Sequence, residues 1–155
     1  MYSIQRKTLI SAAVLAVLAS AYGTASIGAP AVAPTATAEV TMGAPAMLLG
    51  AQEVPPVQSK ASASSSIAVA EDMSVSGSVI TSDIESTMAH IHQGAVGVSG
   101  PVLVTLVKTT DTQWSVPANT KLTPDQYASY KAGELYINVH SAAHKDGEIR
   151  MQLKP

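Results

Sequence analysis

The feature that most restricts the fold of this chain is the alternation of aliphatic and polar residues over short segments. Ile137 and Val139, for example, alternate with Asn138 and His140. A period of two residues places successive side chains on opposite faces of a β-strand. Strands are therefore predicted around residues 67–69 and 74–79 and over Met88–His92, Pro101–Val107, Leu135–His140 and Glu148–Leu153.

Glycine-rich turns separate these predicted strands. Gly94 and Gly97 follow the Met88–His92 strand, and Gly147 precedes the last one. Short strands at this spacing are typical of a sandwich or barrel. The Pro101–Val107 segment is apolar on both faces, which predicts a central strand. The predicted fold class is all-β, an antiparallel β-sandwich.

One short helix is predicted to interrupt the strands, over about residues 123–131. Thr123 and Gln126 have the spacing of a capping box, and Pro124 stands at the first helical position. Gly133 fits the position that ends a helix.

The N-terminal residues have the pattern of a secretory signal peptide. Arg6 and Lys7 precede an apolar stretch, Thr8–Leu18, which is too short to span a bilayer. Ala19–Ala21 is an A-x-A cleavage signal. Residues 1–21 are therefore predicted to be removed on export, leaving a periplasmic or secreted protein with no membrane span in its mature form.

A low-charge segment rich in Ala, Thr and Pro follows, over residues 22–45. Such a composition buries too little apolar surface to offset the entropy of ordering, so this segment is predicted to be a flexible tether. It contains a second, less favoured cleavage signal at Ala36–Ala38. Residues 46–155 are predicted to form one domain.

Charge and cysteine content exclude several classes of protein. A formal net charge of -2 provides no basic field for nucleic acid. The chain has no cysteine, so no disulfide can stabilise it. Its stability must come from the core, from a bound metal ion or from self-association into a homo-oligomer.

The four histidines of the chain are the main candidates for a functional site. His90 and His92 are two residues apart, so a strand would point both imidazoles to one side. His140 has the polar parity of its own strand, and His144 follows in a loop. We expect all four to converge on one divalent transition metal ion. The alternative is a structural pair, His90 and His92, that hydrogen-bonds loop backbone.

Other polar residues are expected around this group. Glu148 could be a fifth metal ligand, could accept from an imidazole and so determine its tautomer, or could pair across the sheet face with Arg150, and the pairing is favoured. Asn138 is expected to have a structural role. Glu53, in the proline-rich Gln52–Pro56 segment, is expected to be exposed.

The residue types favour copper over zinc as the bound ion. Imidazole ligands suit copper, zinc and nickel, and the chain offers no thiolate. Several histidines in an oxidising compartment favour Cu(II), with zinc as the alternative. Catalytic residues stay unknown, because no nucleophile, general base or phosphate-binding glycine loop stands out.

Four sequence blocks follow one another in residues 46–155: Leu48–Pro56, Ala89–Gly94 with Gly100–Val102, Gly133–His144, and Gly147–Leu153. In this order they resemble the CHRD domain, which is named for chordin and also occurs alone in exported bacterial proteins. Met151 stands where that family usually has glycine. The resemblance implies an exported all-β module and no settled activity.

The His90-x-His92 pair, followed by a glycine-rich loop and further histidines, also resembles more weakly the copper–zinc superoxide dismutases. In that family a His-x-His supplies copper ligands on a β-sandwich. This chain lacks the cysteines of that family's disulfide and has too few histidines for both metals. The sandwich is therefore expected to be immunoglobulin-like or superoxide-dismutase-like, without the dismutase activity.

Two classes of function remain open from the sequence. One is an exported protein that binds copper, or zinc, for metal binding or homeostasis. The other is a non-catalytic extracellular module that binds a protein partner.

Overall fold

The computed structural model describes residues 46–155, so the predicted signal peptide and tether lie outside the described residues. Most of its regular elements are short strands. They are β1 (Ala46–Leu49), β2 (Ser62–Ser65), β3 (Ala68–Val69), β4 (Val75–Ser76), β5 (Ser78–Ser82), β6 (Ser86–Gln93), β7 (Val102–Thr105), β8 (Val107–Lys108), β9 (Gln113–Ser115), β10 (Leu135–Ser141) and β11 (Ile149–Gln152), with the 3-10 helix η1 (Gly50–Gln52) and the helix α1 (Pro124–Lys131).

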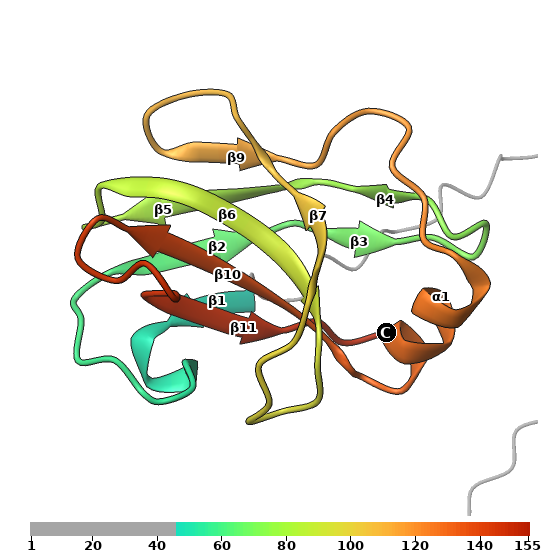
Figure 1. Cartoon of the computed structure of the whole chain (residues 1–155). Coiled ribbons are helices and arrows are strands. Elements are labelled where there is room, and N and C mark those ends of the chain that lie inside the picture. The colour runs from blue at the N-terminus through green and yellow to red at the C-terminus, as the bar shows by residue number, and fades with distance from the viewer. Residues whose placement is uncertain (1–45) are drawn as a thin grey trace, which may run out of the picture. The chain divides into compact units, whose positions relative to one another are not determined.

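Nine strands form one antiparallel sheet in the order β7-β6-β10-β11-β1-β2-β5-β9-β8, and β3 pairs with β4 separately (Figure 1). The prediction of an antiparallel all-β fold with one short α-helix is confirmed. The alternation pattern missed β1 and β9, which have four and three residues. Strands this short show too few alternating positions to stand out in a sequence.

The Pro101–Val107 segment is not a central strand, and that prediction is wrong. It contains β7 and the first residue of β8, and these two strands lie at the two ends of the strand order. Leu106 alone separates them; it is buried, and its N–H donates to Ala89 O at 2.9 Å. The two ends of the curved sheet therefore meet at this segment. The segment is apolar on both faces because it joins the two end strands of the curved sheet, not because it is a central strand.

Gly77 divides the strand predicted over residues 74–79 into β4 and β5. Its φ of 109° lies in the region that favours glycine, and an added Cβ would meet the carbonyl of Ser66. The chain therefore turns at Gly77 from the small sheet into the large one.

The core is built from the aliphatic parity of the strands. Ile137 and Val139 on β10 are fully buried, as is Ile91 on β6 at the register position opposite Ile137. The other large aliphatic side chains that are fully buried are Leu48, Val79, Leu135 and Ile149. The predicted inward parity is confirmed, and it leaves the histidines on the opposite face.

Helix α1 begins with the predicted capping box. Thr123 Oγ1 accepts from Gln126 N at 3.2 Å, and Gln126 Oε1 accepts from Thr123 N at 2.9 Å. Tyr130 anchors the helix beside the C-terminus by donating to Lys154 O at 3.1 Å (Figure 1). Within residues 46–155, no helix is long and apolar enough to cross a membrane.

Candidate metal centre

The histidines lie on the face of β6 and β10 that points away from the aliphatic core. This face is covered rather than exposed, since His92 and His140 retain 8% and 5% of their accessible surface. The cover over His92 is the loop between β6 and β7, tied down where Gly100 N–H donates to Tyr136 Oη at 3.1 Å. The parity prediction therefore located the correct face, on which the loop covers His92 while His90 is half-buried.

Strand pairing brings three of the four histidines together. β6 and β10 are antiparallel neighbours, with His90 opposite Asn138. His140 is two residues after Asn138, so its side chain lies on the same face of the sheet and diagonally next to His90. One ring nitrogen each from His90, His92 and His140 lies within 4.8 Å of the others. We call these three residues the histidine trio.

Two backbone carbonyls determine which nitrogen of His92 and His140 carries the proton. His92 Nδ1 donates to Gly100 O and His140 Nδ1 donates to Lys145 O, each at 2.9 Å. A carbonyl can only accept, so in the neutral rings both Nε2 atoms carry a lone pair. His92 Nε2 is buried and has no hydrogen-bond partner among the described residues. This arrangement resembles metal-binding histidines, whose second nitrogen usually donates to a carbonyl or carboxylate.

The third nitrogen comes from His90. His90 Nδ1 lies 2.9 Å from His140 Nε2. Two nitrogens bound to one ion at about 2 Å are about 2.8 Å apart at a right angle and about 3.3 Å apart at the tetrahedral angle. The His90–His140 separation is therefore compatible with two ligands of one ion. Without an ion, the lone pair on His140 Nε2 requires His90 Nδ1 to be the donor.

The surroundings of His90 and His140 favour the neutral imidazole, which is the form that binds metal. Burial is the main cause that lowers the pKa of His90 to about 4. Electrostatic repulsion from His140, and to a smaller extent from His92, lowers it further. Burial also lowers the pKa of His140, although its hydrogen bond to Lys145 O opposes the shift. At neutral pH these imidazoles therefore have lone pairs available without loss of a proton to solvent.

His144 lies outside the histidine trio. Its backbone N–H donates to Ser141 Oγ at 3.2 Å in the β10–β11 loop. The residue lines a separate cavity of about 230 Å³ together with Glu53 and Asp146. The trio by itself offers three nitrogen ligands and leaves a fourth position open.

Tyr136 is a residue of the site that the sequence analysis did not single out. Its ring stacks on His92, with centroids 4.8 Å apart and planes 6° apart. Its hydroxyl accepts from Gly100 N–H, and the carbonyl of the same glycine accepts from His92 Nδ1. Tyr136 shares the outward parity of Asn138 on β10, which is the signal that would have identified it.

Arg150 lies on β11, on the other side of β10 from His92. Its guanidinium carbon is 3.4 Å from the centroid of the Tyr136 ring. Its Nη2 donates to Val98 O at 2.9 Å and to Ala95 O at 3.3 Å. Arg150 thus supports Tyr136 and at the same time holds down the loop that covers His92.

Glu148 does not pair with Arg150, so the favoured interpretation of that pair is wrong. Glu148 Oε1 accepts from Ser59 Oγ at 2.6 Å. Within residues 46–155 the salt bridge that forms joins Lys121 and Asp72 instead. Side chains two residues apart on a strand share a face, but the Glu148 carboxylate is hydrogen-bonded to Ser59, which is distant in the sequence.

Glu53 is buried, contrary to the prediction of an exposed side chain. Gly50 O accepts hydrogen bonds from the N–H groups of both Glu53 and Val57. These two hydrogen bonds fold the proline-rich segment back onto the sheet. Burial raises the pKa of Glu53. A hydrogen bond from the Val54 backbone and the positive charge of Arg150 both lower this pKa, but burial has the larger effect. Asn138, beside it, is also buried. Glu53, Asn138 and Arg150 therefore form a second polar cluster.

Comparison with known families supports the resemblance found in the sequence. Residues 44–153 match the family model of the CHRD domain. Neither the curated proteins nor the solved structures contain a match to this chain. The likeness to the copper–zinc superoxide dismutases therefore gains no support.

Proposed function

Because this chain belongs to the CHRD domain family, whose domains occur in extracellular proteins, we propose that it is an exported protein that binds one divalent transition metal ion. The ligands are His90, His92 and His140. One observation carries the proposal: the buried Nε2 of His92 has a lone pair and no partner among residues 46–155. A buried polar atom without a partner is costly, and a metal ion would complete its bonding.

Copper is the preferred ion in this proposal, and zinc is the alternative. Three imidazoles without a thiolate suit either metal. The 2.9 Å contact between His90 and His140 nitrogens is close to the spacing of neighbouring ligands in a tetragonal Cu(II) site. The open fourth position would take water, or His144 if the β10–β11 loop moves. The function that follows is metal binding or homeostasis.

Calorimetric titration of tag-free protein with Cu(II) and Zn(II) tests the proposal. We expect one ion per chain and a dissociation constant below about 10 μM. At a free metal concentration of 100 times that constant, the folded state gains about 2.7 kcal/mol, which raises the melting temperature. His92→Ala should lose most of this binding. If His92→Ala binds like the parent protein, the trio is not the metal site.

Two matched variants make the titration specific. Lys60→Ala changes an exposed residue and should bind metal like the parent. His144→Ala removes the histidine that lies outside the trio and reports whether it supplies the fourth ligand.

A second candidate function is a non-catalytic interaction module, and one observation favours it. Val54, Val96 and Val98 keep 38%, 78% and 52% of their surface exposed. Val54 and Val96 line the same cavity. Exposed aliphatic side chains gathered around a cavity are typical of a binding surface.

A further inference from the structure

Outside the histidine trio, Arg150 lines a cavity of about 470 Å³. The segment after β1 forms one wall with Val54 and Pro56, and the β6–β7 loop forms the other with Val96 and Gly97. Glu53 and Arg150 also line it. Its wall is mainly aliphatic, and it contains two side chains of opposite charge.

Each of these two charged side chains has an unused hydrogen-bonding atom. Glu53 Oε1 and Arg150 Nη1 are buried and find no partner within the described part of the chain. Glu53 Oε1 can accept a hydrogen bond, and Arg150 Nη1 can donate one. Packing alone does not explain two such atoms on one cavity, since each costs stability when left unpaired.

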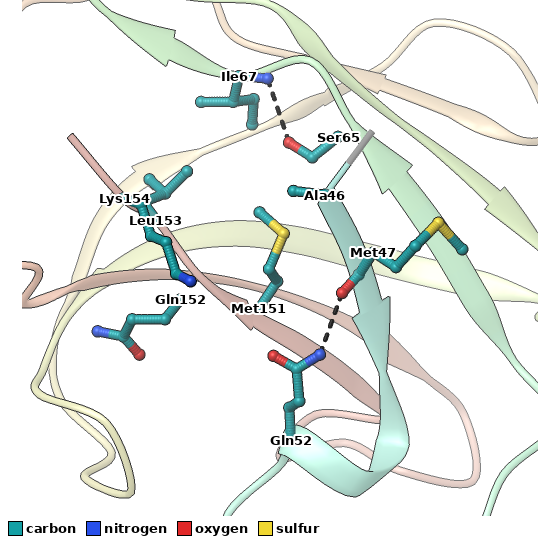
Figure 2. Close-up of a pocket in the computed structure, with 9 residues that line it drawn as sticks. All are labelled: Ala46, Met47, Gln52, Ser65, Ile67, Met151, Gln152, Leu153 and Lys154. Atoms are coloured by element: carbon teal, nitrogen blue, oxygen red, sulfur yellow. Dashed lines mark hydrogen bonds between the residues drawn. The ribbon is translucent and has the colours of Figure 1, made fainter. Parts of the chain in front are cut away.

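A second cavity, of about 330 Å³, lies next to the first, since Gln52 and Gln152 line both. The second cavity lies where β1 and β11 separate, because their pairing is limited to Leu49 and Arg150. In the view of Figure 2, Met151 lies between the β1 residues on one side and the C-terminal residues on the other. We call these two neighbouring cavities, which Gln52 and Gln152 line in common, the groove.

We propose that this groove binds an extended peptide segment with a small aliphatic side chain. One backbone N–H of the peptide would donate to Glu53 Oε1, and one of its backbone carbonyls would accept from Arg150 Nη1. A peptide backbone supplies both donors and acceptors, and a valine-sized side chain suits the walls formed by Val54 and Val96. Extended peptides commonly bind between or beside strands in this way.

The two unpaired atoms are covered in the free protein. A ligand can reach them only if the turn at Val96 and Gly97 shifts. Gly97 has φ of 78° and an added Cβ there would touch nothing, so this turn projects from the body of the domain. This inference rests on the interaction-module function and specifies its partner; it needs no metal ion, although the loop that shifts also contacts His92 through Gly100 O.

NMR titration of the tag-free protein in excess chelator tests the groove without any metal. The probe is N-acetyl-valine-N-methylamide, for which we expect a dissociation constant of about 1 mM from its size. The amide signals of Val96 and Gly97 and the side-chain signals of Arg150 should shift. N-acetyl-alanyl-valyl-alanine-N-methylamide should bind several-fold tighter, because it extends into the second cavity.

Variants and control compounds separate the parts of the proposal. Val96→Ser alters an exposed wall without removing core packing and should weaken binding about fivefold. Glu53→Gln should weaken it as well, whereas Lys60→Ala should leave it unchanged. Isovalerate, which has the aliphatic group without the amide, should not bind. Binding of isovalerate or N-acetylglucosamine as tight as that of the peptide, or no shift at Val96 and Gly97, would overturn the proposal.

Discussion

Replacing Arg150 with methionine is the strongest single test of how the covered face is held together. Arg150 has 2% of its surface exposed and makes a 2.9 Å hydrogen bond to Val98 O. This charge-assisted bond contributes about 2 kcal/mol, and the longer one to Ala95 O about 1 kcal/mol. The contact with the Tyr136 ring adds about 1 kcal/mol.

Two effects reduce this loss. Methionine removes the cost of burying a charge and fills most of the same volume. The carbonyls of Ala95 and Val98 lie in a loop near solvent and can be hydrated again. We therefore expect Arg150→Met to lower the free energy of unfolding by about 3 kcal/mol, which is about 12 °C in melting temperature for a domain of this size.

Glu53 determines how this loss depends on pH. Arg150 lowers the pKa of Glu53 against the larger effect of burial, so Arg150→Met should raise that pKa further. A carboxyl whose pKa is raised in the folded state favours folding at low pH and loses this advantage as the pH rises through the folded pKa. The variant should therefore be less destabilised at pH 4 than at pH 7.

Urea denaturation of the parent, Arg150→Met, Glu53→Gln and the double variant measures these terms. The double variant should be more stable than the sum of the single losses, since it removes the buried carboxylate together with its cation. A loss below about 1 kcal/mol for Arg150→Met would refute the reasoning. A loss of equal size at both pH values would refute the role given to Glu53.

Two further predictions concern the same face. The pKa of His90, lowered to about 4, and the lowered pKa of His140 mean that the unfolded chain binds protons first as the pH falls below about 6.5. Metal-free protein should therefore lose stability as the pH falls from 6.5 towards 4. In thermal melts, the melting temperature of His90→Gln should fall less steeply with pH than that of the parent, and equal slopes would contradict this cause. Gly147→Ala should destabilise the domain by about 2 kcal/mol or more in denaturant melts, because φ at Gly147 is 133° and a Cβ would meet the Glu53 carboxylate. A stability equal to that of the parent would show that the Glu53 side chain can move away.

The sequence determined the local features of this protein. The capping box at Thr123 formed as predicted, because its groups lie within one turn of each other. Strand parity separated Ile137 and Val139 from Asn138 and His140, since side chains alternate along any strand. The order of the four sequence blocks identified the family that the family model then matched.

Tertiary structure decided which segments cover the polar face. The sequence predicted an outward face for His92 and Arg150 but contained no sign that the β6–β7 loop would bury it. The exposed Glu53 expected from a proline-rich segment is buried because Gly50 O draws that segment back over the sheet. Such contacts join residues far apart in the chain, and no local periodicity records them.

The site shows the same division. Spacing predicted that His90 and His92 act together, and parity added His140, because all three positions depend only on strand geometry. His144 lies in a loop, whose path no period predicts, and the structure places it outside the trio. The tautomers of His92 and His140, and hence the lone pairs that make the trio a candidate metal site, depend on carbonyls of Gly100 and Lys145 that only the folded chain brings into contact.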